Sequence, residues 1–211
     1  QTVDATELES TTTSWTDGSW YIVPEGGLTI SGRIAVSGTV NLILRDGAEL
    51  TASEGITTTG ATLNIYAQST GTGALTATGA NGANYAGGNA GIGGIGVGND
   101  ASGGAGGTVN IYGGTVTATG GNGAQCGGGG AGIGGGGLGY RSSGVQGGTV
   151  NIYGGTVTAT EAAMQAAQSI YTAVLLQQPV VLAETLVALA QASVAVETPI
   201  KAVPVPVQAA H

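Results

Sequence analysis

The sequence TVNIYGGTVTAT runs from Thr108 to Thr119 and returns unchanged from Thr149 to Thr160, 41 residues later. A shorter run, AGIGG at 90–94, returns at 131–135 with the same offset, and degenerate copies of the repeat lie upstream at 62–66 with 75–78 and at 39–43. An exact internal repeat of this length is typical of proteins built by stacking one small structural unit on the next.

Within each repeat the apolar residues alternate with polar ones. Val109 and Ile111 share one face, whereas Asn110 and Tyr112 share the other, and TVTAT alternates in the same way. A unit of three short segments cannot bury its apolar face alone, but equivalent segments stacked about 4.8 Å apart enclose a continuous interior. We therefore predict an all-β fold, a right-handed parallel β-helix (solenoid) of about five rungs. An antiparallel meander closed by the Gly-Gly turn remains the alternative.

Glycine-rich stretches interrupt the later repeats. The 43 glycines concentrate in runs such as Asn81–Ala90 and Gly120–Gly130, which carry little side-chain surface to bury. We expect these runs to leave the coil as loop excursions in which glycine permits a positive φ. A phosphate-binding loop is excluded, because no Gly-Lys-Ser/Thr and no helical pattern follow the glycines.

The composition excludes several functions. Only 8% of the 211 residues are charged and the formal net charge is −8, so we expect no nucleic-acid partner. With one cysteine and one histidine, Cys126 and His211, we expect neither a disulfide framework, nor a metal site, nor a cofactor. The chain begins at Gln1, as expected after removal of an export signal, and no stretch makes a convincing membrane span, which predicts a secreted or cell-surface protein.

The glycine-rich pattern stops after Gly155, so we divide the chain into a β-helix at 1–160 and a C-terminal segment at 161–211. The second part is rich in Ala, Val, Leu and Gln, and is expected to be partly helical up to Pro179 and extended at Val203–Val207. It would cap the open end of the coil or dock on a neighbouring molecule, giving a homo-oligomer or fibre. A segment foreign to the natural repeat is a third possibility.

The run Gly32–Thr51, followed by GGTVTATGG and AGIGG units, resembles the glycine-rich repeat regions of large secreted surface proteins of gut Firmicutes. These regions are often labelled carbohydrate-binding-domain-containing. The resemblance covers about Trp15–Thr160 and implies a β-helical extracellular module, with no catalytic residues to carry over. The chain departs from the pattern from Glu161 onward.

Charged side chains are too sparse in the repeats for paired-carboxylate chemistry, and a lone terminal His211 cannot complete a catalytic triad, so we predict that the chain is not an enzyme. Two ladders of neutral side chains remain. An Asn and Tyr ladder would present rings and amides to a polysaccharide or cell-surface glycan, although self-stacking of the ladder is the stronger explanation. A Thr-x-Thr ladder resembles the flat faces of ice-binding β-solenoids. The first ladder comprises Asn64, Tyr66, Asn110, Tyr112, Asn151 and Tyr153, with Asn41 in line, and the second comprises Thr76, Thr78, Thr117, Thr119, Thr158 and Thr160.

Overall fold

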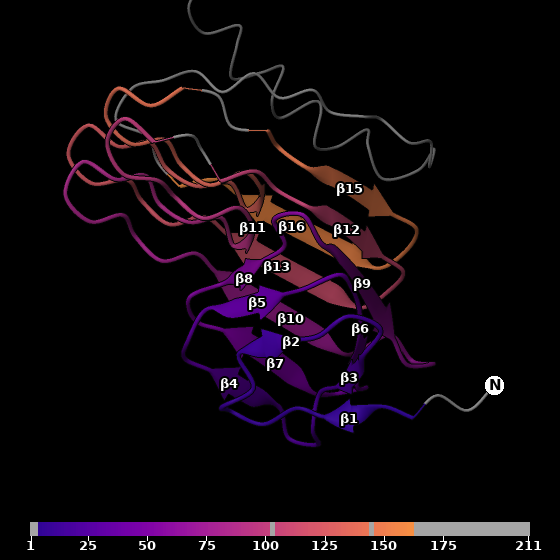
Figure 1. Cartoon of the computed structure of the whole chain (residues 1–211). Helices are drawn as coiled ribbons and strands as arrows, with labels where there is room; N and C mark the ends of the chain where they lie inside the picture. The colour runs from indigo at the N-terminus through magenta and orange to yellow at the C-terminus, as the bar shows by residue number, and fades with distance from the viewer. Residues whose placement is uncertain (1–3, 102–103, 144–145, 163–211) are drawn as a thin grey trace, which may run out of the picture. The chain divides into compact units, whose positions relative to one another are not determined.

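A computed structural model describes residues 4–101, 104–143 and 146–162, which form three parallel β-sheets and contain no helix (Figure 1). The strands are β1 (Thr6–Glu7), β2 (Ser14–Trp15), β3 (Trp20–Ile22), β4 (Leu28–Ile30), β5 (Ile34–Val36), β6 (Thr39–Leu44), β7 (Glu49–Ala52), β8 (Ile56–Thr57), β9 (Thr62–Ala67), β10 (Ala74–Thr78), β11 (Ile92–Gly93), β12 (Thr108–Ile111), β13 (Thr115–Thr119), β14 (Ile133–Gly134), β15 (Thr149–Ile152) and β16 (Thr156–Thr160).

The chain visits the three sheets in turn. Sheet A has the order β1-β3-β6-β9-β12-β15, sheet C the order β16-β13-β10-β7-β4, and sheet B the order β14-β11-β8-β5-β2. Successive strands along the chain therefore lie in different sheets, and each strand pairs with its equivalents one repeat earlier and one repeat later. This arrangement of stacked parallel strands is consistent with a β-solenoid.

The register confirms that like segments lie over like segments. Val109 pairs with Leu63 on one side and with Val150 on the other, and Val116 pairs with Leu75 and Val157. The antiparallel meander is wrong, because Gly113-Gly114 joins a strand of sheet A to a strand of sheet C rather than closing a hairpin. Gly114 has φ +85° at this corner, a conformation that glycine adopts without steric cost.

The apolar faces of the three sheets meet in one continuous core. Its columns are fully buried: Leu42, Ile65 and Ile111 from sheet A, Leu50, Leu75 and Val116 from sheet C, and Ile34, Ile56 and Ile92 from sheet B. Each such side chain contributes about 1.5–3 kcal/mol when it leaves water. The period-two alternation in the sequence therefore places the core correctly.

The glycine-rich connections extend from the sheets as a second packed body, and Figure 1 shows them running side by side beyond β8 and β11. Segment 86–91 illustrates the packing. Its backbone bonds to 79–82 (Asn89 N to Ala80 O, 2.9 Å), to 94–98 (Ala90 N to Gly94 O, 3.0 Å), to 127–131 (Gly88 N to Gly128 O, 2.9 Å), and also to 120–124 and 135–139. A strand in a sheet has at most two such neighbours, since its amides point along one line. Amides that point in several directions are typical of extended helices with three residues per turn.

In the runs 81–90 and 120–130, glycine is needed for space and not for backbone conformation. A Cβ at Gly88 or Gly121 would overlap the backbone carbonyl of a neighbouring segment, and neither residue has a positive φ. The expectation that glycine permits a positive φ in these two runs is therefore wrong, because none of their glycines has one. We call the body formed by 79–91, 94–101, 104–107, 120–132, 135–143 and 146–148 the glycine array.

Of the expected capping or docking segment, 161–211, residues 163–211 lie outside the described residues. At the last strand of sheet A, Val150 and Ile152 are 37% and 50% exposed, whereas their equivalents one repeat earlier are buried. The last repeat thus leaves its core residues partly exposed.

Candidate functional site

The asparagines of sheet A form a hydrogen-bonded ladder. Asn64 Nδ2 donates to Asn41 Oδ1 (2.9 Å), Asn110 Nδ2 to Asn64 Oδ1 (2.7 Å), and Asn151 Nδ2 to Asn110 Oδ1 (2.8 Å). Parallel in-register pairing puts these residues opposite one another, so each amide reaches the same atom one repeat earlier. All of the bonds run in the same direction, and Asn41 at the start of the ladder is 9% exposed.

The tyrosines next to this ladder stack face to face. Tyr66 and Tyr112 have ring centroids 4.7 Å apart at an interplanar angle of 4°, and Tyr112 and Tyr153 are 4.8 Å apart at 9°. Trp20 extends the column, with its ring 5.3 Å from that of Tyr66. The sequence pattern missed Trp20, because its backbone lies in register with the asparagines and only its large ring reaches the column.

Contacts between neighbouring side chains of the Asn ladder and of the Tyr column occupy much of the surface that a ligand could contact. The faces of Tyr66 and Tyr112 are covered by neighbouring rings, which leaves ring edges, hydroxyls and the outer face of Tyr153, the most exposed ring at 63%. Burial first and the neighbouring Tyr112 second raise the pKa of the Tyr66 hydroxyl above its ordinary value. Asn64, Asn110 and Asn151 each donate one of their two amide N–H groups within the ladder, which leaves the second N–H unused by the ladder.

The threonines of sheet C form a longer column than the sequence pattern indicated. Thr76, Thr117 and Thr158 lie in register, and the pairing continues through Thr51 to Thr29. The remaining predicted threonines, Thr78, Thr119 and Thr160, form a second column beside it. The recurring Leu-Thr-Ile and Leu-Thr-Ala triplets at 28–30, 50–52 and 75–77 were the signal for the two additional members.

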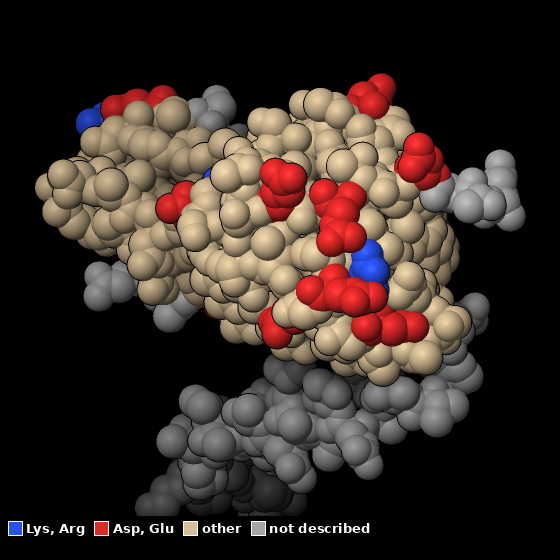
Figure 2. Space-filling view, turned by 90° about the horizontal axis from the view of Figure 1, so that it is seen from below, with Lys and Arg blue, Asp and Glu red and all other residues tan. Residues whose placement is uncertain are grey.

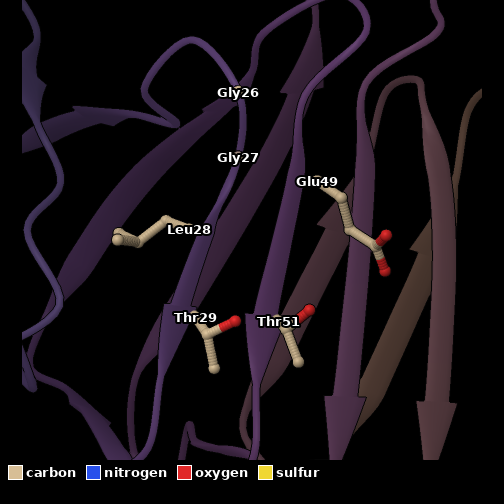
Figure 3. Close-up of a pocket in the computed structure, with 6 residues that line it drawn as sticks. All are labelled: Gly26, Gly27, Leu28, Thr29, Glu49 and Thr51. Carbon is tan, nitrogen blue, oxygen red and sulfur yellow. The ribbon is translucent and has the colours of Figure 1, made fainter.

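A shallow depression of about 300 Å³ lies at the β4 edge of this face, lined by Gly26, Gly27, Leu28, Thr29, Glu49 and Thr51 (Figure 3). Glu49 accepts a hydrogen bond from Thr76 Oγ1 at 2.6 Å, so its carboxylate is tied to the threonine column. A Cβ at Gly27 would approach the backbone oxygen of Glu49 to 2.7 Å, so this glycine permits close packing of β4 on β7.

Acidic side chains gather on the face formed by the first repeats, and Figure 2 shows a basic side chain among them. Arg45 Nη2 lies 3.0 Å from Glu7 Oε2, and its Nη1 lies 3.5 Å from Glu25 Oε1. Asp46 accepts backbone hydrogen bonds from Thr70 and Thr72, which hold the pKa of its carboxyl below the ordinary value. Arg45 and Asp46 thus hold neighbouring repeats together on this face.

Arg33 links the glycine array to the sheets through hydrogen bonds. Its guanidinium donates to Thr57 Oγ1 (2.7 Å), to the backbone oxygen of Glu54 (2.6 Å), and to those of Ala90 and Gly94 in the later repeat (3.1 and 3.2 Å). Burial lowers the pKa of Arg33 to about 10, against the smaller opposing effect of Glu54, so it remains charged at neutral pH. Arg33 thus makes polar contacts across successive repeats.

Within the described ranges, no group of three or more His, Cys, Asp or Glu side chains is placed to hold a metal ion. The only cysteine, Cys126, is exposed, and His211 lies outside the described residues. No helix in the described part of the chain is long and apolar enough to cross a membrane. Comparison of the chain with protein-family models, curated proteins and solved structures finds no match.

Proposed function

We propose that this chain is a non-catalytic, secreted or cell-surface structural and adhesion module, built as a right-handed parallel β-helix of about five rungs. The observation that supports this most is the Asn ladder, in which side chains on successive strands satisfy one another and stiffen the outer face of sheet A. A rigid, neutral surface of repeated groups suits attachment or spacing, whereas catalysis needs converging groups of different chemistry.

Carbohydrate is the ligand class that we propose for the Asn and Tyr columns. Tyrosine hydroxyls, amide N–H groups that the ladder does not use and the outer face of Tyr153 offer both hydrogen bonds and ring contact to a sugar. A glycan array tests this with Tyr112→Ala and Tyr153→Ala, beside Glu25→Ala as an exposed control on another part of the surface. We expect both tyrosine variants to lose at least tenfold in affinity, and unchanged binding in both would contradict the proposal.

Ice binding is the second candidate, and the extended threonine column is the observation that favours it. Five threonines in register on parallel strands give a regular array, on strands about 4.8 Å apart. Thermal hysteresis measured at micromolar protein should then be present and should disappear in Thr117→Tyr. The matched control, Thr11→Tyr, changes an exposed turn residue and should retain the hysteresis. A wild-type protein without hysteresis excludes this function.

A fibre subunit is the third candidate, supported by the exposure of Val150 and Ile152 on the last strand of sheet A. The segment 161–211 would then either cap its own coil, partly as a helix, or dock on a neighbouring molecule. Size-exclusion chromatography with light scattering distinguishes the two roles, by comparing the full chain with one ending at Thr160. Aggregation of the shorter chain supports a cap, whereas conversion of filaments to monomers supports a linker.

A further inference from the structure

Strained backbone is concentrated at the far turns of the glycine array. In the described ranges, the non-glycine residues with positive φ are Tyr85, Asp100, Gln125 and Arg141, at φ 54–60°. Each lies at the tip of a different glycine-rich excursion. Glycine would adopt this conformation without strain and is abundant on either side, so the sequence places side chains where the backbone disfavours them. Strain of this kind is commonly kept at sites with a function.

The tips are brought together by the packing of the array. Tyr140 N donates to Tyr85 O at 2.9 Å, and Asp100 N donates to Tyr140 O at 3.2 Å. The tyrosine rings are 6.1 Å apart and tilted by 54°, and Arg141 Nε lies 3.9 Å from Asp100 Oδ1. The turn at Gln125 joins them through Ala124 N to Ala86 O at 3.0 Å. We call Tyr85, Asp100, Gln125, Tyr140 and Arg141 the tip cluster.

The two long repeats differ most in chemistry at these tips. Their strands carry the identical TVNIYGGTVTAT, and AGIGG is also unchanged. At the tips, Asn84-Tyr85 in the first copy stands where Gln125-Cys126 stands in the second, and Asn99-Asp100 stands where Tyr140-Arg141 does. One substitution reverses a charge and two others exchange an aromatic ring for a small or polar group. A constant framework with chemically different loop tips is the arrangement of a binding scaffold.

We infer that the tip cluster is a carbohydrate-recognition site, separate from the columns of sheet A. Tyr85 and Tyr140 are 43% and 45% exposed, so each presents a ring surface on which a sugar can stack. Asp100 accepts and Arg141 donates hydrogen bonds to sugar hydroxyls, and both are more than two-thirds exposed. Their opposite charges cancel, which suits a neutral ligand. This inference rests on the proposed adhesion function but assigns the contact to another part of the molecule.

The size of the cluster favours a sugar over a protein. Each tyrosine exposes on the order of 100 Å², because its full surface is roughly 150–250 Å². Five side chains of this kind fall below the roughly 800 Å² that each partner buries in a stable protein interface. A ligand of one to three sugar rings matches the available surface.

An array of polysaccharides and glycoproteins, each printed before and after periodate oxidation, tests the inference with the full chain. Tyr140→Ala and Arg141→Gly are compared with the wild type and with Glu25→Ala, and far-UV circular dichroism melting confirms that each variant folds. We expect both tip variants to lose at least tenfold in binding, and periodate treatment to abolish the wild-type signal. Because Arg141→Gly relieves the positive φ, its melting temperature should be unchanged or higher.

Each result assigns the site differently. Loss of binding in the tip variants supports the inference. If Tyr112→Ala and Tyr153→Ala keep their binding, the sheet A site is contradicted, and if they also lose it, both sites contribute. Binding that is kept in the tip variants and lost in the two sheet A variants overturns the inference and leaves the proposed sheet A site standing. Binding that is confined to the glycoproteins and survives periodate identifies a protein partner and overturns the carbohydrate assignment. A wild-type chain that binds nothing on the array overturns both glycan proposals, leaving the structural role.

Discussion

Replacing Gly88 by alanine should destabilise the protein, although Gly88 lies outside every strand and has no positive φ. An added Cβ would overlap the backbone carbonyl of Gly121 and lie 2.8 Å from Asn122 O, so segments 86–91 and 120–124 must separate. Separation strains the bonds that join these two segments, from Gly121 N to Asn89 O (2.8 Å) and from Ala124 N to Ala86 O (3.0 Å). Overpacking and weakened hydrogen bonds together cost about 2–4 kcal/mol.

Gly98→Ala is the matched control, because a Cβ at Gly98 meets nothing within 4 Å and its φ is also not positive. Alanine there should be neutral or should stabilise by about 0.4–1 kcal/mol, through loss of entropy in the unfolded chain. Thermal unfolding followed by circular dichroism should put Gly88→Ala roughly 5–12 °C below the wild type. A melting temperature for Gly88→Ala equal to or above that of Gly98→Ala would refute the packed array and favour free loops.

Three further changes test other contacts. Asn110→Leu removes the hydrogen bonds to Asn64 and Asn151, and should lower the free energy of unfolding in urea by about 1–2 kcal/mol. This is roughly twice the loss expected for Asn151→Ala, which removes one hydrogen bond. Equal losses in the two variants would contradict the ladder. Arg33→Met keeps the apolar stem but removes the hydrogen bonds to both repeats, and should lower the free energy of unfolding by about 2–3 kcal/mol. Amide hydrogen exchange at 90–94 should become faster. Unchanged exchange would mean that Arg33 does not hold the array. Hydrogen bonds from the Thr70 and Thr72 amides lower the pKa of Asp46 on folding. The stability that this carboxylate contributes is therefore fully present above its unfolded pKa of about 3.9, and is lost as the pH falls through its folded pKa. Asp46→Asn should therefore narrow the stability difference between pH 6 and pH 3, and an unchanged difference would show that the carboxylate does not contribute.

The sheets could be predicted from the sequence because apolar and polar side chains alternate along each strand. Val109 and Val150 alternate with polar residues at period two, and exact copies at a fixed offset can stack in only one register. The Asn ladder and Tyr column follow from the same register. The glycine array was not predictable in this way, since glycine has no side chain and leaves no periodicity, so only the backbone bonds reveal which segments are neighbours.

The tip cluster shows the same limit. Nothing in the sequence around Tyr85 or Arg141 distinguishes a strained turn from an ordinary loop, and their proximity depends on how the array packs. A direct comparison of the two repeats, residue by residue, did contain a signal, because Asp100 stands in the first copy where Arg141 stands in the second. Divergence between internal copies thus indicated the tips, whereas the identical strands indicated only the framework.

The hydrogen bonds between segments of the glycine array determine how the protein transmits a force applied to the outer turns. Glycine-rich chain is usually a slack tether that extends under small loads. Here the segment 86–91 is bonded to neighbours on several sides, so tension applied near Tyr85 spreads over adjacent segments instead of peeling one chain away. Part of that load would reach the strands through the Arg33 guanidinium. We therefore expect the array to resist extension more than a free glycine-rich chain would.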